Sequence, residues 1–125
     1  MNKFIWASAH KPTPEQIQEL GEVEYLSQVA PELQEQLNNT PSDLESLIEL
    51  ADKVLQLAYK GKYTLVQVGG SPAFQVVLGH RNHRIGGPMI TLAYAHSERV
   101  SQDEPQADGS VKKVSLFKHI KFIQV

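Results

Sequence analysis

The chain has no cysteine among its 125 residues, and it has no long apolar run. Without cysteine, the fold cannot depend on disulfide bridges, and catalysis cannot use a thiolate. A membrane helix needs about 20 apolar residues, and no segment approaches that length. The opening MNKFIWASAHKPTPEQ becomes polar too soon for a signal-peptide core. We therefore expect a cytoplasmic protein that makes no membrane contact.

Charge of either sign is modest, and it is unevenly distributed. The net charge is −2, with −6 in residues 1–60 and +4 in residues 61–125. A long nucleic acid requires a more strongly basic surface, whereas a local basic pocket in the second half would suffice for a small anion. Four C-terminal lysines favour a solvated strand edge over a nucleic-acid stripe: Lys112, Lys113, Lys118 and Lys121.

Apolar patterns and helix-start signals predict elements in the order βαβααβαββ. Strands separated by helices indicate a mostly parallel sheet. We therefore expect one domain over residues 1–125, with a small Rossmann-like α/β fold, a sheet flanked by helices and an antiparallel C-terminal edge pair. The expected strands are 3–9, 22–27, 63–68, 89–95 and 111–125, with a polar loop over 101–110. Helices are expected to begin at Thr13-Pro14, Pro31, Thr40-Pro41-Ser42-Asp43 and Ser71-Pro72, the last one running to about His80.

Ligands of such folds bind beyond the carboxyl ends of the parallel strands. Three segments are expected there and close together: Ser8 to His10, Gly69 to Ser71, and His96 to Arg99. Glycine lets a ligand approach the backbone, and a helix N-terminus attracts an anion. The Ser-Pro pair could equally mark only a helix start, since two other helices begin with similar signals and need no ligand.

Arg99 and the histidines are the remaining candidates for chemistry. The planar guanidinium of arginine binds phosphate well, but a surface arginine paired with Glu98 is an equally good interpretation. The five histidines lack the spacing of a metal site, so we expect no metal ion. His10, at the end of the first strand, is better placed for proton transfer or base recognition.

Two segments resemble a known family. The opening 10-HKPTPEQ-16 and the closing 95-AHSERV-100 and 109-GSVKKVSLFKHIKF-122 are similar to small CRISPR-associated proteins of the Csx group that accompany type III systems, most of all to the family numbered twenty. Ala9 stands where that family has serine, and Ile123 and Val125 replace its terminal arginine and tyrosine. The matching positions are His10 with Thr13 and Gln16, Gln67 with Gly69 and Gly70, Arg99, and Phe117 with His119 and Phe122.

The resemblance implies a ring nuclease related to the CARF sensor domains. Such a protein binds a cyclic oligoadenylate, here cyclic tetra-adenylate, across the two-fold axis of a homodimer and cleaves it without metal or cofactor. Arg99 and His10 would then be catalytic. Arg99 would stabilise charge on the phosphate, and His10 would orient the attacking 2′-OH or protonate the leaving oxygen. Ligand-binding positions would be Ser8, Gln67 (reading an adenine edge), Gly69, Gly70, Ser71 and His96.

Two other functions remain open at this point. The protein could bind the cyclic nucleotide without cutting it, as a sensor or a sponge. It could also be an interaction module with no nucleotide, in which the glycine turn has only a structural role. Cleavage products would separate the first alternative from a nuclease, and a nucleotide-induced shift in melting temperature would separate the second from both.

Overall fold

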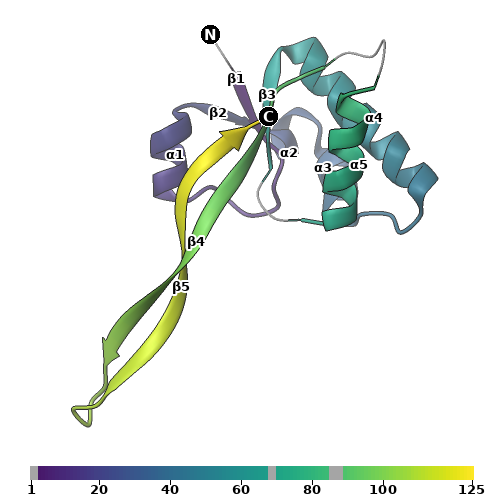
Figure 1. The fold of residues 1–125 in the computed structure, drawn as a ribbon. Helices are drawn as coiled ribbons and strands as arrows, with labels where there is room; N and C mark the ends of the chain where they lie inside the picture. Colours follow the sequence, from purple (N-terminus) through teal and green to yellow (C-terminus); the bar gives the residue numbers. More distant parts are fainter. Residues whose placement is uncertain (1–2, 68–69, 85–88) are drawn as a thin grey trace.

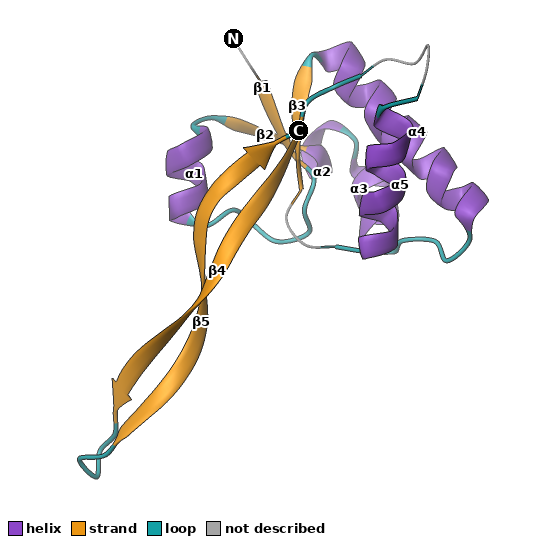
Figure 2. Ribbon diagram, viewed as in Figure 1, coloured by secondary structure: helices purple, strands orange, loops and turns teal. Residues whose placement is uncertain are grey.

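The computed structural model describes residues 3–67, 70–84 and 89–125 (Figure 1). It is a mixed α/β fold, as the sequence predicts (Figure 2). Its strands are β1 (Lys3–Trp6), β2 (Val23–Tyr25), β3 (Tyr63–Gln67), β4 (Leu92–Pro105) and β5 (Val111–Gln124). Its helices are α1 (Pro14–Leu20), α2 (Leu26–Val29), α3 (Pro31–Asn38), α4 (Leu44–Gly61) and α5 (Pro72–Asn82).

The five strands form one sheet in the order β2-β1-β3-β4-β5. Strands β1 to β4 are parallel, and β5 pairs antiparallel with β4. The expected small Rossmann-like sheet with an antiparallel edge pair is therefore confirmed. The chain places β2 on one side of β1 and β3 on the other, so the strand order reverses between β1 and β3. Ligand sites of such sheets lie at that position.

Alternating residues of the strands build one core on each face of the sheet. Leu65 and Leu92 belong to the larger core, which also contains buried side chains of α4 and α5. Val66 and Ala93 point to the other face, where they pack in a smaller core with Leu20 of α1. A residue of β3 or β4 can therefore be assigned to a face by its position in this alternation.

Except for α2, each helix begins at or directly after a start signal that the sequence predicts. The Thr13 and Gln16 side chains cap each other's backbone N–H in a capping box at α1. The Asp43 carboxylate accepts from the Ser46 N–H at 2.9 Å at the start of α4. Ser71 Oγ accepts from the Phe74 N–H at 3.3 Å at the start of α5. Each bond satisfies a backbone donor that has no partner within the first turn of its helix.

Several of the predicted strand boundaries are wrong. The first strand ends at Trp6 rather than at residue 9, and the fourth begins at Leu92 rather than at residue 89. The expected second strand ends at Tyr25, because Leu26 is fully buried and begins the short helix α2. The expected loop over residues 101–110 is a strand as far as Pro105, and only the turn near Gly109 separates it from β5. The polar residues of β4 can be extended because β5 supplies their backbone partners across the hairpin.

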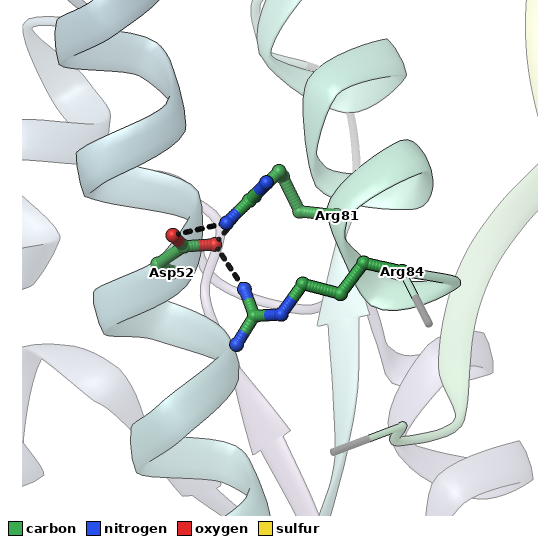
Figure 3. A network of polar contacts seen from close by, with 3 residues as sticks. All are labelled: Asp52, Arg81 and Arg84. Carbon is green, nitrogen blue, oxygen red and sulfur yellow. Dashed lines mark hydrogen bonds and ion pairs between the residues drawn. The ribbon is translucent and has the colours of Figure 1, made fainter. Parts of the chain in front are cut away.

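Helices α4 and α5 are joined by a charged network (Figure 3). Arg81 donates from Nε and Nη2 to the two oxygens of Asp52, both at 2.9 Å. Arg84 donates from Nη1 to Asp52 Oδ1 at 2.8 Å. These bonds, with the one from Arg81 first, hold the pKa of the Asp52 carboxyl below its ordinary value. The network fixes the C-terminal end of α5 against the middle of α4.

Strands β4 and β5 continue far beyond the rest of the sheet. Strand β3 pairs only with Leu92 to Tyr94 of β4. Residues 95–121 therefore form a twisted two-stranded hairpin, here called the arm, which projects from the carboxyl edge of the sheet (Figure 1). No helix in the described part of the chain has the length and apolar content to cross a membrane.

Candidate functional site

A pocket of about 280 Å³ lies at the carboxyl ends of β1 and β3, where the strand order reverses. The loop after β1, the start of α5 and the end of α3 form its walls. It brings together the predicted catalytic residue His10 and four of the predicted ligand residues: Ser8, Gln67, Gly70 and Ser71. Gly69, also predicted, lies outside the described residues.

Gln67 lines this pocket with a buried amide. The residue is 5% exposed, and its Oε1 accepts from Gln75 Nε2 at 2.5 Å. Its own Nε2 has no hydrogen-bond partner among the described residues. A buried donor without a partner destabilises the protein by about 1 to 3 kcal/mol. A ligand acceptor, such as a ring nitrogen of a purine base, would supply the missing partner.

The glycine turn leads directly into α5. Gly70 has φ +94, a conformation that residues with a side chain rarely adopt. The first turn of α5 carries no acidic residue, so the partial positive charge of its N–H groups stays available to an anion. In the part of the chain that the structure describes, no lysine or arginine lines the pocket. Among the described residues that line it, backbone and neutral polar groups would therefore meet the charge of a phosphate.

His10 stands at the edge of the pocket. If its Nδ1 carries the hydrogen, it donates to the Lys11 carbonyl at 3.1 Å, and Nε2 is then an acceptor. The indole Nε1–H of Trp6 donates to the His10 carbonyl at 2.7 Å, and the two rings meet edge to face at 5.9 Å. The buried indole thus fixes the backbone at His10, while the imidazole remains exposed.

A second hollow, of about 430 Å³, lies next to the first. The two hollows share Ser8, Ala9 and His10, and the second extends toward Tyr25 and Gln28. The loop after β1 is therefore accessible from both sides. A ligand larger than one nucleotide could occupy both hollows and contact this loop in each.

The sequence did not predict the wall formed by α3. Asn38 lines the pocket, and its Oδ1 accepts from Gln34 Nε2 at 2.9 Å. The same Gln34 nitrogen donates to the Ala7 carbonyl at 3.2 Å, which joins α3 to the end of β1. The only signal in the sequence was the spacing of two amides, Gln34 and Asn38, which lie four residues apart on a short helix. That spacing is common on solvated helix surfaces.

His96 and Arg99 do not line the pocket; both lie on the arm. The three predicted segments were expected to be neighbours, and within a single chain this is wrong for the segment from His96 to Arg99. The guanidinium of Arg99 lies 5.2 Å from the centre of the Phe117 ring rather than on Glu98. His96 Nε2 is 3.8 Å from a Glu98 carboxylate oxygen. Strand β4 carries these residues away because it continues into the hairpin.

Comparison with known proteins gives one match. The model of the family described as "Uncharacterized protein MJ1673 family" matches residues 2–123, nearly the whole chain. No curated protein and no solved structure matches. The description of the matching family names no activity, so a proposal about function depends on the site.

Proposed function

The chain belongs to the Uncharacterized protein MJ1673 family, and we propose that it is a ring nuclease that binds and cleaves a cyclic oligoadenylate. The substrate would be cyclic tetra-adenylate, and its cleavage would switch off type III CRISPR antiviral signalling in the cytoplasm. No cofactor or metal ion takes part in this proposal. The observation that supports it is the pocket at the strand-order reversal, which combines Gln67, His10 and the N-terminus of α5.

The size and chemistry of the two hollows suit this ligand. The first hollow, about 280 Å³, is at the lower limit for small-molecule sites and would hold one nucleotide of the ring. There the amide of Gln67 would bind the edge of an adenine, and the backbone N–H groups at the start of α5 would bind its phosphate. The second hollow would take the neighbouring nucleotide, so that the linking phosphate lies at the loop containing His10.

The reaction would use a nucleophile that belongs to the substrate. The ribose 2′-oxygen attacks the adjacent phosphorus, the bond from phosphorus to the 5′-oxygen breaks, and a 2′,3′-cyclic phosphate forms. The 2′-OH loses its proton, and the leaving 5′-oxygen gains one. His10 can accept or donate such a proton. The protein must also hold the attacking oxygen in line with the leaving group and stabilise charge on the phosphate oxygens.

The test is incubation of purified protein with cyclic tetra-adenylate and cyclic hexa-adenylate in EDTA, with products identified by chromatography and mass. Linear fragments that end in a 2′,3′-cyclic phosphate are expected. His10→Ala should slow the reaction, and His80→Ala, which removes an imidazole outside the pocket, serves as the matched control. Intact rings together with an unchanged melting temperature would contradict both binding and cleavage.

A non-catalytic binder is the second candidate. The observation that favours it is that no lysine or arginine is found among the described residues that line the pocket, and such a cation usually stabilises a phosphoryl transition state. A binder would raise the melting temperature in the presence of the ring but leave the ring intact. The same samples therefore distinguish the two candidates.

A further inference from the structure

Two side-chain amides line the first hollow, and each is oriented by a neighbouring glutamine. Gln67 Oε1 accepts from Gln75 Nε2 at 2.5 Å, and Asn38 Oδ1 accepts from Gln34 Nε2 at 2.9 Å. In both amides the oxygen is therefore engaged, and the NH2 group is left to bind a ligand. Neither Gln67 Nε2 nor Asn38 Nδ2 has a partner among the described residues. The two amides thus offer donors, for which a ligand must supply acceptors.

The buried Gln34 fixes the amide of Asn38. Gln34 is 6% exposed, and its Nε2 also donates to the Ala7 carbonyl at 3.2 Å. Because one nitrogen serves both acceptors, the end of β1 sets the position of Gln34, and Gln34 sets the orientation of the exposed Asn38. A donor that is held in place before binding loses less conformational freedom when a ligand arrives.

The end of α3 and the start of α5 face the same hollow. Leu37 of α3 and Phe74 of α5 both pack on the larger core, and both line the hollow. Asn38 follows Leu37, and Ser71 caps α5. A hollow of about 280 Å³ is at the lower limit for small-molecule sites, so groups on these two walls can contact the same ligand. The NH2 group of Asn38 and the N–H groups at the start of α5 can therefore bind one phosphate.

These donors carry no full positive charge. His10 is the only titratable side chain among the described residues that line the hollow, and Lys11 lines only the second hollow. The residues outside the described ranges, 1–2, 68–69 and 85–88, include no lysine, arginine, aspartate or glutamate. The start of a helix supplies about half an elementary charge. Such a site stabilises a single negative charge, whereas a second one taken out of water without a cation is strongly disfavoured.

We propose that Asn38 binds the phosphate of the nucleotide in the first hollow, and that this hollow accepts a phosphodiester and rejects a phosphomonoester. A phosphodiester carries one negative charge. A phosphomonoester carries close to two at pH 7, because its second pKa is about 6. The site would thereby admit an internal phosphate of a ring and exclude AMP. The inference rests on the proposed function in that the ligand is a nucleotide, but it does not depend on cleavage.

Two ligands that differ by one methyl group test the charge selection. AMP and the methyl ester of its phosphate share the base and the ribose, and only AMP gains a second negative charge between pH 5 and pH 8. The titrations are followed by NMR of isotope-labelled protein. The side-chain NH2 signals of Asn38 and Gln67 report the first hollow, and that of Gln28 reports the second.

At pH 8 the methyl ester should bind about tenfold more tightly than AMP, and at pH 5 the two should bind nearly equally. Any charge that His10 gains in acid acts on both ligands alike. Equal affinities at pH 8 would overturn the selection for a diester. Signals that shift for Gln28 but not for Asn38 would overturn the placement of the phosphate.

Asn38→Asp tests the residue itself. The aspartate can still accept from Gln34 Nε2, but an oxygen and a negative charge replace the NH2 donor. We expect the affinity for the methyl ester to fall about tenfold or more, with an unchanged circular dichroism spectrum. Gln36→Glu is the matched control, because it makes the same charge change at an exposed position of α3 that does not line the hollow. Equal affinities of the two variants would overturn the role of Asn38.

Asn38→Lys should change the selection. It places a cation where the described lining of the hollow has none, so a second negative charge gains a partner. At pH 8 the affinity for AMP should rise about tenfold relative to that for the methyl ester, and Gln36→Lys should keep the preference of the wild type. An unchanged preference in Asn38→Lys would contradict the explanation by charge.

Cyclic tetra-adenylate separates this inference from the proposed function. If the wild type binds the ring without cleaving it, the proposed nuclease is wrong, and the preference for the methyl ester at pH 8 still supports the inference. If the wild type cleaves the ring but AMP competes as well as the methyl ester, the nuclease stands and the inference is wrong. If neither the ring nor the methyl ester shifts the signals of Asn38 and Gln67, both are overturned.

Discussion

Asn82 is a buried polar residue that stabilises the fold through two hydrogen bonds to the backbone of Ile90. It is 1% exposed, its Nδ2 donates to the Ile90 carbonyl at 2.8 Å, and its Oδ1 accepts from the Ile90 N–H at 2.9 Å. Asn82→Ala would leave both backbone groups without that partner and lower the free energy of unfolding by about 2 to 3 kcal/mol. Urea denaturation measures the loss. The exposed Asn39→Ala should change the free energy by less than about 0.5 kcal/mol, and equal losses would contradict this role.

Gln67 should contribute to binding rather than to stability. Gln67→Met keeps an unbranched side chain of similar length but removes the amide. The substitution removes the hydrogen bond that Oε1 accepts from Gln75, but it also removes a buried nitrogen that has no partner among the described residues. Because these two effects oppose each other, we expect the free energy of unfolding to change by less than about 1 kcal/mol. Loss of a hydrogen bond to the adenine should weaken ring binding about tenfold, or 1.4 kcal/mol. Titration calorimetry with cyclic tetra-adenylate measures this. The exposed Gln56→Met is the control, and an equal loss there would contradict the role.

At the residue scale, the sequence predicted what followed from strand ends and helix starts. Ser8 follows an apolar run that was expected to be a parallel strand, and Gln67 ends another. Ser71 caps a helix that begins with proline. All three positions were therefore predictable. Asn38 and Gln75 were not predictable. Each is an amide on a helix, and only the packing of that helix decides whether it faces the pocket or the solvent.

At the element scale, the arm is where prediction from sequence failed. Residues 101–105 read as a polar loop because a strand is normally recognised by apolar residues on at least one face. In a two-stranded arm, both faces can be polar for several residues, since backbone pairing alone fixes the extended conformation. Arg99 lies beyond the pocket because β4 continues into the arm. If β4 had ended at residue 95, as predicted, Arg99 would have been expected at the edge of the sheet.

Helices α4 and α5 should respond to acid through Asp52. Its folded-state pKa lies below its ordinary value because of Arg81 and then Arg84, so its stabilising effect is complete above the ordinary pKa of 3.8. The effect is lost as the pH falls through the lower, folded-state value. Since its side chain is 33% exposed, screening limits the contribution to about 1 kcal/mol. Asp52→Asn should be less stable than the wild type by that amount at pH 7.

The difference between the wild type and Asp52→Asn should shrink below about pH 4, where protonation removes the charge from the wild type as well. Urea denaturation of both proteins at pH 7 and pH 3 measures it. Glu49→Gln on the same helix is the matched control, because its ion pair with Lys53 is exposed and contributes little. A difference that stays constant with pH would contradict the charge-based explanation.

At the scale of the whole molecule, the chain combines a small body, with a core on each face of its sheet, and an arm that contacts the smaller core and α1 only at its base, through Ala95 and His119 (Figure 1). The pocket belongs to the body and lacks a cationic side chain, whereas the arm carries an arginine that forms no ion pair among the described residues. A single chain therefore offers no cationic side chain to a phosphate in this pocket among the described residues that line it.

If the protein is a homodimer, as the resemblance to ring nucleases implies, its thermal stability must depend on protein concentration. Unfolding of a dimer releases two chains, so a hundredfold higher concentration adds about 2.7 kcal/mol per dimer, which should raise the melting temperature by about 5 °C. Differential scanning fluorimetry over that range measures the rise. Leu116→Glu places a charge among the exposed apolar residues of the arm, and it should melt at the same temperature throughout if the arm forms the dimer interface. Val76→Glu, at an exposed apolar residue of α5 outside the arm, should follow the wild type. A melting temperature of the wild type that is independent of concentration would mean that the body folds without a partner.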